Sequence, residues 1–432
     1  MNKTIIGVVG LGYVGLPLAV GLSKYFKVVG FDVDHVKILE LQNNFDRNGQ
    51  MVNEEITKGD ITYTVDSNEL CIANFFIIAV PTPVNARNHP DLSYIKNATR
   101  SVGRALNRGD VVVYESTVYP GLTENYCIPE LEEMSTLDVG LDFNVGYSPE
   151  RINPGDSKHT LDKVTKIISA QNGKTLDRIE EVYSTICPSL YKAPDIRTAE
   201  AAKVIENAQR DINVAFMNEL AIIFDAMGIN THEVLKAART KWNFLDFVPG
   251  LVGGHCISVD PYYLAYQSQA HGYTPEVILS GRKINDSMGK YIAHKHMKEI
   301  IKNNQSLDCH TVGIFGLTFK ENISDLRNSK VFDIISEFKS MGVEVIAHDP
   351  LVTRGDVINY CGSINMNEAI VPILSKVDSA LICVAHNAYR DVDWSKMIRA
   401  QVPVAKNFLL GDIKNVYTPD GFERNNFKRW AL

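Results

Sequence analysis

The chain lacks the excess of positive charge that a nucleic-acid-binding surface requires. Its 432 residues include 44 lysines and arginines against 51 aspartates and glutamates, which gives a formal net charge of −7. A balance of this sign argues against a nucleic-acid partner and suits an enzyme that acts on small molecules.

Paired cysteines and metal-binding motifs are also missing. The seven cysteines are scattered, and no two of them have C-x-x-C spacing, so neither a disulfide framework nor a zinc ribbon is indicated. The eleven histidines form no H-E-x-x-H motif. We therefore expect reduced thiols, a cytoplasmic location and no metal site.

The sequence has no low-complexity tract and no short-period repeat. Its start, MNKTIIGVVGLGYVGLPLAVGL, has the early lysine and apolar run of a signal peptide or a membrane span. However, glycines at positions 7, 10, 12, 15 and 21 weaken a spanning helix, and no cleavage site of small residues follows. A buried strand followed by a glycine-rich turn explains these residues better, and we expect no membrane insertion.

Alternating strand and helix patterns in the first part of the chain predict an α/β fold with a parallel, doubly wound sheet. Strands are expected at Thr4–Val9, Lys27–Phe31, Phe75–Val80 and Asp110–Tyr114, with a helix at Leu16–Tyr25. Near residue 196 the pattern changes. The segment RTAEAAKVIENAQRDINVAFMNELAIIFDAMG predicts one long helix that ends at Gly228.

Strand and helix patterns alternate again from about Cys309. The segments HTVGIF, GVEVIAHDP and Ser379–Val384 are expected as strands, Ser329–Met341 as a helix, and the polar tail ERNNFKRWAL as a surface end. The chain is thus expected to hold two Rossmann-like domains, 1–196 and 301–432, joined by a helical domain over 197–300.

The segment GLGYVG predicts a dinucleotide-binding turn. Gly10, Gly12 and Gly15 form G-x-G-x-x-G between a strand pattern and a helix pattern, where glycine allows a tight turn and close approach of a pyrophosphate. Asp32 ends the next strand, about 20 residues beyond Gly12, at the spacing of a ribose-binding acid. A carboxylate there favours NAD over NADP. The alternative is a structural strand–turn–helix with a surface aspartate.

Three polar residues of the long helix share one face, because Lys203, Asn207 and Arg210 are spaced at i, i+4 and i+7. Periodicity alone favours a solvated polar stripe. A lysine and a carboxamide one turn apart are also suited to polarising an oxygen. Glu150 in GYSPERINPGD is either a loop salt-bridge partner or a catalytic base.

Cys256 in GGHCISVD has three interpretations. A metal ligand would need companions, and only His255 is close. A small apolar filler is the default for a single cysteine. The flanking glycines instead allow the backbone to carry a thiol close to a ligand, and Asp260 at i+4 could order a water there.

Taken together, several ordered blocks resemble the UDP-glucose/GDP-mannose dehydrogenase family over nearly the whole chain. These blocks are GLGYVGLPLA, GFDVD, VPTP, ESTVYPG, YSPERINPGD, AEAAKVIENAQRDINVAFMNE, PGLVGGHCISVDPYYL and GLTFKENISDLRNSK. Within the family the chain looks most like the UDP-N-acetylhexosamine 6-dehydrogenases. UDP-glucose enzymes typically carry Phe-Leu-Arg and a lysine where this chain has Arg151-Ile152-Asn153 and Val259.

The resemblance implies a four-electron oxidation of a sugar C6 alcohol to a carboxylate, consuming two NAD+. Cys256 would add to the aldehyde, and the resulting thiohemiacetal would be oxidised to a thioester. Lys203 and Asn207 would stabilise the oxygen that gains negative charge, Asp260 with Thr117 would position the water, and Glu150 would act as base in hydrolysis or anchor the substrate. The product would be a uronic acid precursor of a surface polysaccharide.

The resemblance also implies the binding residues. Those for NAD are Gly10, Gly12, Tyr13, Val14, Gly15, Asp32, Thr82, Thr117 and Arg327. Those for the UDP-sugar are Arg151, Asn153, Lys203, Asn207, Arg210, Gly250, Gly253, Gly254, Phe319 and Lys320. A homodimer built across the long helix is implied, with Arg239 or Lys241 as a basic residue lent to the partner.

Three alternatives to a UDP-GlcNAc or UDP-GalNAc 6-dehydrogenase stay open at this point. The first is the same chemistry on UDP-ManNAc or UDP-glucose. The second is a one-step dehydrogenase that makes one NADH per sugar, and the third is a non-catalytic nucleotide-binding regulator that keeps the fold.

Overall fold

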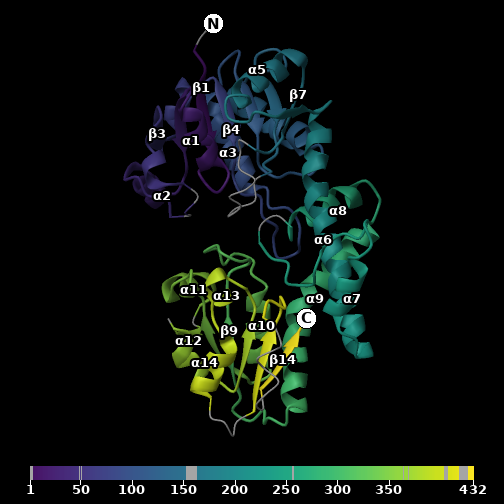
Figure 1. Ribbon diagram of the computed structural model, residues 1–432. Helices are drawn as coiled ribbons and strands as arrows, with labels where there is room; N and C mark the ends of the chain where they lie inside the picture. Colours follow the sequence, from purple (N-terminus) through teal and green to yellow (C-terminus); the bar gives the residue numbers. More distant parts are fainter. Residues whose placement is uncertain are drawn as a thin grey trace. The chain divides into compact units, whose positions relative to one another are not determined.

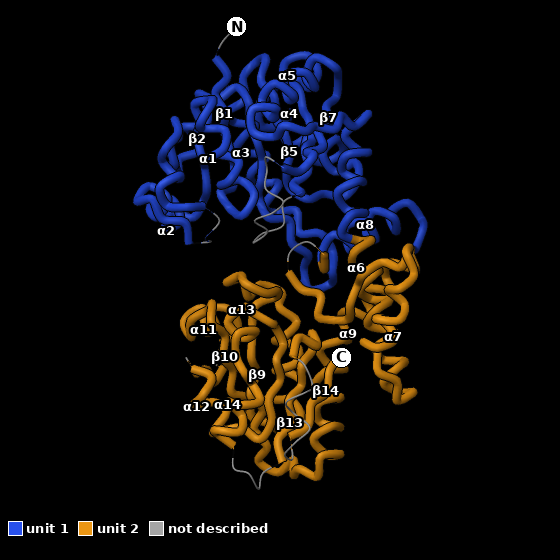
Figure 2. The backbone as a smooth tube through the Cα atoms, in the orientation of Figure 1, with its two compact units in different colours: residues 1–207, 259–274 blue, residues 208–258, 275–432 orange. Residues whose placement is uncertain are grey.

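The computed structural model describes residues 3–47, 49, 51–151, 163–254, 257–362, 364–367, 369–402, 407–417 and 427–432. Non-contiguous parts of the chain form two compact units (Figure 2). The first holds Met1–Asn207 and Val259–Thr274, and the second holds Ala208–Ser258 and Pro275–Leu432. Each unit has its own sheet.

The first unit is built on an eight-stranded sheet in the order β3-β2-β1-β4-β5-β6-β7-β8. The strands are β1 Ile5–Val9, β2 Lys27–Phe31, β3 Ile61–Thr64, β4 Phe75–Ile78, β5 Val111–Tyr114, β6 Asn144–Tyr147, β7 Lys166–Ala170 and β8 Leu190–Lys192. All neighbours pair parallel except β6 and β7, which are antiparallel. The strand order reverses between β1 and β4, and in such sheets ligands bind at the carboxyl ends of the strands at this switch.

Helices cover both faces of this sheet (Figure 1). They are α1 Gly15–Ser23, α2 His35–Gln42, α3 Ser93–Ala105, α4 Ile128–Ser135 and α5 Gly173–Tyr183, with short turns η1 Asn53–Glu55, η2 Ser67–Ile72 and η3 Thr123–Cys127. Helix α8 Asp260–Ala270 also belongs to this unit but lies apart from the sheet. The sequence of β4 explains the two layers. Phe76 and Ile78 pack in one core cluster with α3 and α4, while Phe75 and Ile77 pack in the other with α1 and α5. A strand that is buried on both faces is apolar throughout.

The second unit holds a six-stranded, all-parallel sheet in the order β11-β10-β9-β12-β13-β14. Its strands are β9 Thr311–Phe315, β10 Glu344–His348, β11 Asn365–Met366, β12 Ser379–Ile382, β13 Phe408–Asp412 and β14 Phe427–Ala431. Its helices are α10 Val331–Ser340, α11 Arg354–Cys361, α12 Ile370–Leu374, α13 Asn387–Arg390 and α14 Trp394–Gln401. The prediction of two doubly wound α/β sheets is confirmed.

The expectation of a surface tail at the C-terminus is wrong. Residues Phe427–Ala431 form β14, which pairs with β13, and Trp430 and Leu432 are buried. Trp430 donates its indole N–H to His296 Nδ1 at 3.0 Å. The charges of the tail suggested a solvated end, but its apolar side chains cover the edge of the second sheet.

Two long helices, α6 Ile196–Met227 and α9 Glu276–Lys302, and the short helix α7 Thr231–Ala238 complete the fold. The 32-residue helix α6 matches the long helix that the sequence predicts, and Gly228 follows it with a left-handed φ of +70°. In the described part of the chain, no helix is both long and apolar enough to cross a membrane.

The two sheets open with the same backbone turn. Gly10 follows β1 with φ +92° and donates its N–H to the carbonyl of Phe31, while Gly316 follows β9 with φ +89° and donates to the carbonyl of His348. The next amide then donates to an aspartate at the end of the second strand, from Leu11 to Asp32 and from Leu317 to Asp349. The turn after the first strand therefore has the same glycine conformation and the same hydrogen bonds in both units, as expected of two Rossmann-like folds.

Candidate active site

The three glycines of the first turn differ in their surroundings. A Cβ on Gly10 would lie 2.8 Å from the carbonyl oxygen of Ala79, and one on Gly15 would overlap the carbonyl oxygen of Gly10. A Cβ on Gly12 would meet nothing within 4 Å. Packing thus requires two of the glycines, whereas Gly12 faces open space beside the start of α1, as a pyrophosphate-binding turn requires. Tyr13 and Val14 are partly buried and connect this turn to α1.

Asp32 lies at the carboxyl end of β2, as a ribose-binding acid must. Its carboxylate accepts the backbone N–H groups of Leu11 at 2.9 Å and Asp34 at 3.0 Å, and the ammonium of Lys37 at 2.7 Å. A carboxylate has about four acceptor positions, so ribose hydroxyls can still be bound. The residues present therefore fit NAD.

Sequence reasoning missed Lys37. It stands five residues after Asp32, in α2, and its charge neutralises the carboxylate that was expected to repel a 2′-phosphate. Repulsion by Asp32 is consequently weaker than the aspartate alone implies. In the sequence, Lys37 could have been recognised as a partner of Asp32 only from its position in the first turn of the helix that follows Asp32.

The loops after β4 and β5 reach the same edge of the sheet, because both strands are parallel neighbours near the switch. Thr82 and Thr117 lie in these loops and are partly buried. Ser116 Oγ donates to the carbonyl of Val80 at 2.7 Å, which joins the two loops. The hydroxyl of Tyr263, on α8, donates to the carbonyl of Pro83 at 3.2 Å.

Lys203, Asn207 and Asp260 form a buried polar group in the first unit. Lys203 is 8% and Asn207 7% exposed, which rules out a solvated stripe for these two positions. Asn207 Nδ2 donates to Asp260 Oδ2 at 2.5 Å. Burial raises the pKa of Asp260 to about 6, although the Lys203 charge and the Asn207 hydrogen bond both favour the carboxylate. Within the described residues, the other oxygen, Oδ1, has no hydrogen-bond partner.

Arg210, one turn further along α6, is exposed, unlike Lys203 and Asn207. Glu200, one turn before Lys203, is buried and accepts the backbone N–H groups of Gly121 and Thr123. Burial raises the pKa of Glu200 to about 7. Glu200 thereby attaches the end of the ESTVYPG loop to α6.

Glu150 is buried beside a second charge cluster. The ammonium of Lys166 bonds Glu115 at 2.7 Å and the carbonyl of Pro149 at 3.2 Å, and its positive charge acts on Glu150. Burial raises the pKa of Glu115 to about 7 despite Lys166. Lys166 is a second residue that sequence reasoning missed, since its partners are distant in the sequence.

Three further predicted site residues are Arg151, Asn153 and Cys256. Arg151 is exposed and bonds Glu206 at 2.8 Å and the carbonyl of Thr165 at 2.8 Å. Asn153 and Cys256 lie outside the described residues. The structure therefore describes the surroundings of Arg151 but not those of Asn153 or Cys256.

In the second unit, the predicted residues Phe319 and Lys320 line a cavity after β9. Its other lining residues are Leu251, Thr318, Glu321, Ser329, Lys330, Val331, Cys383, Val384 and Lys414. Sequence reasoning missed Lys414, which follows β13. A Cβ on Gly250 would lie 2.7 Å from Lys414 Nζ, so the glycine loop contacts this lysine.

The glycine loop itself is closely packed. A Cβ on Gly253 would lie 2.5 Å from the carbonyl oxygen of Asn328, and one on Gly254, which has φ +85°, would lie 2.7 Å from the Phe319 ring. Arg327 bonds Asp325 at 2.7 Å. Arg239 bonds Asp246, and Lys241 is exposed.

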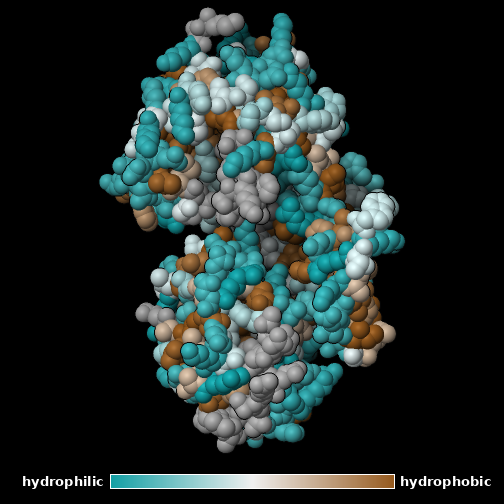
Figure 3. All heavy atoms as spheres, in the orientation of Figure 1, coloured by the Kyte–Doolittle hydropathy of each residue, from teal (hydrophilic) through white to brown (hydrophobic). Residues whose placement is uncertain are grey.

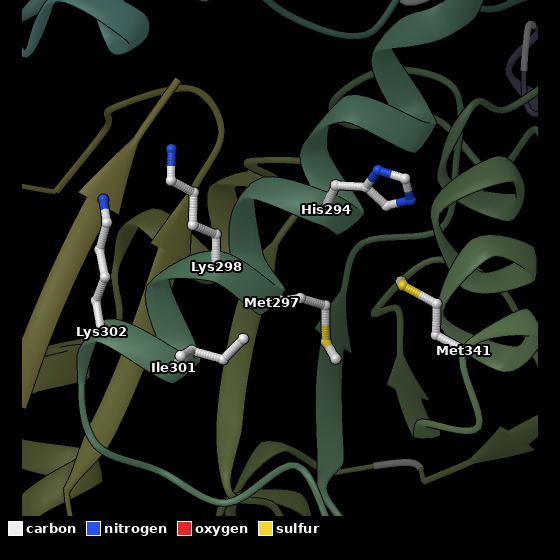
Figure 4. A pocket seen from close by; sticks show the side chains of 6 residues that line it. All are labelled: His294, Met297, Lys298, Ile301, Lys302 and Met341. Atoms are coloured by element: carbon white, nitrogen blue, oxygen red, sulfur yellow. The ribbon is translucent and has the colours of Figure 1, made fainter.

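A second hollow in this unit, of about 490 Å³, lies between α9 and the end of α10 (Figure 4). Met297 and Met341 point toward one another across it, whereas the ammonium groups of Lys298 and Lys302 point away. None of the predicted site residues lines this hollow. In the part of the chain that the structure describes, no three His, Cys, Asp or Glu side chains are arranged to hold a metal ion.

A glycine turn and an aspartate at the end of the second strand, at the switch point of a doubly wound sheet, are the arrangement found in NAD-binding enzymes. Three models of one family match the chain: the NAD binding domain over residues 4–187, the central domain over 197–287 and the UDP binding domain over 313–419. The chain belongs to the UDP-glucose/GDP-mannose dehydrogenase family and is an NAD-dependent UDP-sugar dehydrogenase.

Individual relatives agree with this assignment. Protein CapL of Staphylococcus aureus is 50% identical over 392 residues, which cover 90% of this chain and 92% of that protein. The UDP-N-acetyl-D-glucosamine 6-dehydrogenase of Salmonella typhi is 48% identical over 394 residues, covering 91% and 92%. The solved UDP-D-ManNAc dehydrogenase of Pyrococcus horikoshii has a TM-score of 0.88 and 28% identity, covering 99% of each chain.

Proposed function

We propose that the chain oxidises the C6 hydroxyl of a UDP-N-acetylhexosamine, UDP-GlcNAc or UDP-GalNAc, to the uronic acid. NAD+ supplies the hydride acceptor in each of two oxidations, so two NAD+ are consumed per sugar. The observation that carries the proposal is the buried group of Lys203, Asn207 and Asp260. An ordinary alcohol dehydrogenase needs no carboxylate to position a hydrolytic water.

In the first oxidation the C6 carbon loses a hydride and its hydroxyl loses a proton. The ammonium of Lys203 and the second amide hydrogen of Asn207 would stabilise the oxygen as its charge changes. The Cys256 thiolate then adds to the aldehyde carbon: a C–S bond forms, the C=O π bond breaks, and the oxygen takes up a proton to give a thiohemiacetal. Loss of the second hydride from this carbon, together with the proton of its hydroxyl, gives a thioester.

Hydrolysis completes the reaction. A water adds to the thioester carbon, the C–S bond breaks, and the Cys256 thiol is regenerated. Asp260 Oδ1 is buried and has no partner within the described residues, so it is available to orient this water with Thr117. The pKa of about 6 makes Asp260 an effective proton acceptor near neutral pH, and Glu150 would assist as base or substrate anchor.

The second Rossmann-like sheet would bind the UDP part of the substrate. Lys320, Lys330 and Lys414 line one cavity there with Phe319, and ammonium groups suit a diphosphate. The match of residues 313–419 to a UDP binding domain supports this assignment. The same matches support three domains close to 1–196, 197–300 and 301–432.

The preference for an acetamido sugar over glucose rests on the sequence. Arg151, in SPERINPGD, and Val259, before Asp260, depart from the UDP-glucose pattern. Identity is 48% with the Salmonella UDP-N-acetyl-D-glucosamine enzyme and 30% with the UDP-N-acetyl-D-mannosamine dehydrogenase of Pyrococcus horikoshii, which favours GlcNAc over ManNAc among the acetamido sugars. We further propose that the product serves surface polysaccharide synthesis and that the enzyme acts in the cytoplasm.

A homodimer across α6 is part of the proposal. Phe216, Ile223 and Met227 are spaced by about whole helical turns and are each exposed. Trp242, beyond α7, is 92% exposed, and Figure 3 shows apolar atoms at the surface around α7. A second copy of the chain would cover this face, with Arg239 or Lys241 reaching the partner's substrate. Phe216→Glu should shift the mass measured by light scattering to that of a monomer.

A substrate panel tests the proposed activity. The purified protein is incubated with NAD+ and UDP-GlcNAc, UDP-GalNAc, UDP-ManNAc or UDP-glucose, and both NADH and sugar product are measured. Two NADH and one uronic acid per sugar, with an acetamido sugar preferred, is the expected result. One NADH with an aldehyde product would indicate a one-step dehydrogenase, and binding without turnover would indicate a regulator.

A further inference from the structure

The glycine loop Gly250–Gly254 is held at both ends by asparagine side chains that no motif assigns a role. Asn218, on α6, binds Gly250, and Asn328, before α10, binds Gly254. We propose that Asn218 and Asn328 are positioning residues that clamp this loop in the conformation that binds the UDP-sugar. The inference rests on the proposed function, because it takes Gly250–Gly254 as a substrate loop.

The side chain of Asn218 makes the two hydrogen bonds that a neighbouring backbone segment would otherwise make with Gly250. Its Oδ1 accepts the Gly250 N–H at 2.8 Å, and its Nδ2 donates to the Gly250 carbonyl at 3.0 Å. Both backbone polar groups of Gly250 are therefore satisfied by one side chain that is fully buried. A buried peptide group left without these bonds is unfavourable, because its polar atoms have lost water without gaining a partner, so the loop is strongly held at this point.

The orientation of the Asn218 amide is dictated by a chain of buried groups. Arg282 donates to Asp211 Oδ1 at 2.6 Å, which keeps Asp211 an acceptor. Asn285 must then direct its NH2 group to Asp211, at 2.7 Å, and its oxygen to Asn218 Nδ2, at 2.8 Å. This leaves Asn218 Oδ1 for the Gly250 N–H. The network fixes which way the amide points, a property that simple packing would not require.

Asn328 fixes the other end of the loop. Its Nδ2 donates to the Gly254 carbonyl at 3.0 Å and to Ser258 Oγ at 2.7 Å, and Ser258 Oγ donates to the same carbonyl. The backbone of Asn328 is left-handed, with φ +54°, a conformation that asparagine and glycine tolerate best. Its side chain is exposed, so its substitution should not disturb the core.

The clamp matters for substrate because the loop contacts the cavity's side chains. Gly250 lies against Lys414, and Gly254 lies against the ring of Phe319. A loop that moves by an ångström changes the space between these groups, where the UDP-sugar is proposed to bind. NAD+ is proposed to bind at the sheet of the first unit, so the affinity for NAD+ should not change when the clamp is removed.

Two variants test the clamp, each with a matched control. Asn218→Ser is compared with Asn213→Ser, because Asn213 is half-buried on the same helix and bonds only the carbonyl of Gln209 among the described contacts. Asn328→Gly keeps the left-handed backbone and removes the side chain. Its control, Asn304→Gly, changes an exposed asparagine with the same φ of +54°.

We expect both clamp variants to raise the KM for the UDP-sugar about tenfold, with the KM for NAD+ changed less than twofold. Both controls should behave like the wild type. Asn328→Asp, which keeps the size but loses the donor, should resemble Asn328→Gly. A purely structural role would instead change both KM values together or lower only the amount of folded enzyme, which melting temperatures report.

A readout that needs no turnover separates this inference from the proposed function. Hydrogen–deuterium exchange over residues 249–251 should accelerate in Asn218→Ser and stay unchanged in Asn213→Ser, and calorimetry should show weaker binding of UDP alone. If wild type makes no uronic acid but these shifts occur, the proposed function fails and the clamp stands. If folded Asn218→Ser and Asn328→Gly keep wild-type UDP affinity and exchange, the clamp is refuted.

Discussion

Replacing Asp260 with asparagine should stabilise the first unit while stopping the last step of the reaction. The pKa of this fully buried carboxyl is raised from 3.8 to about 6, chiefly by burial. Because the folded pKa lies above the unfolded value, the ionised group destabilises the fold. This cost is absent well below pH 4, grows as the pH rises from about 4 to 6, and is constant above that.

The size of the effect follows from the shift. A difference of about two pKa units, at about 1.4 kcal/mol each, makes the ionised carboxylate cost on the order of 3 kcal/mol at pH 8. The contributions of Lys203 and Asn207 are already included in the shifted pKa. Asp260→Asn keeps the shape and can still accept from Asn207, so most of this cost should be recovered.

Two assays check the prediction. Urea unfolding at pH 8, followed by a probe in the first unit, should move to higher denaturant in Asp260→Asn, and the gain should shrink at pH 5. Intact-mass measurement after incubation with NAD+ and UDP-sugar should show a covalent sugar adduct that persists, since hydrolysis loses its water-orienting group. General-base removal typically slows a step by about 10²–10⁴-fold. An equally active Asp260→Asn, or one less stable than wild type at pH 8, would refute the reasoning.

Three further predictions follow from other parts of the structure. Cys256→Ala should abolish uronic acid formation while NAD+ and UDP-sugar still bind, as measured by product analysis and calorimetry; acid formation near the wild-type rate would exclude the covalent route. Lys37→Met should raise the ratio of kcat/KM for NAD+ over NADP+ several-fold, because Asp32 then acts without the cation 2.7 Å away; a lower ratio would contradict this role. Trp430→Ala should cost about 3–5 kcal/mol in the second unit, seen as a lower melting temperature, whereas Val277→Ala, at a 68% exposed position, should have no such effect.

Local patterns sufficed for much of the fold. The strand Lys27–Phe31 and the end of α6 before Gly228 coincide with their predicted bounds, because a buried strand and a long helix each have a strong sequence period. The tail was misjudged for a physical reason. The strand β14 is stabilised by contacts with distant parts of the chain and not by a local pattern. Trp430, for example, bonds His296, which lies 134 residues away in the sequence.

The candidate site divides in the same way. Gly10 and Asp32 stand in a motif whose spacing implies dinucleotide binding, whereas the spacing of Lys203 and Asn207 alone favoured a solvated stripe and only the family resemblance implied their roles. Lys166 and Lys414 carry no such local pattern, because each is defined by distant partners: Glu115 for the first, and Gly250 for the second. A charge buried by tertiary contacts cannot be distinguished in the sequence from the many solvated lysines.

The aspartate of the repeated turn is engaged differently in the two sheets. Asp349 occupies the place of Asp32, but it accepts the N–H groups of Leu317, Thr318 and Leu351, and His386 Nε2 lies 3.1 Å from it, so all of the about four acceptor positions of its carboxylate are used. His386 Nδ1 accepts the Asn322 N–H, so His386 Nε2 must carry the proton toward Asp349. Although burial raises the pKa of Asp349, the hydrogen bond from His386 and the backbone N–H groups of Leu317 and Leu351 lower it below its usual value. The aspartate at this place thus holds the loop of Phe319 and Lys320 in the second sheet, whereas in the first sheet we propose that it binds ribose.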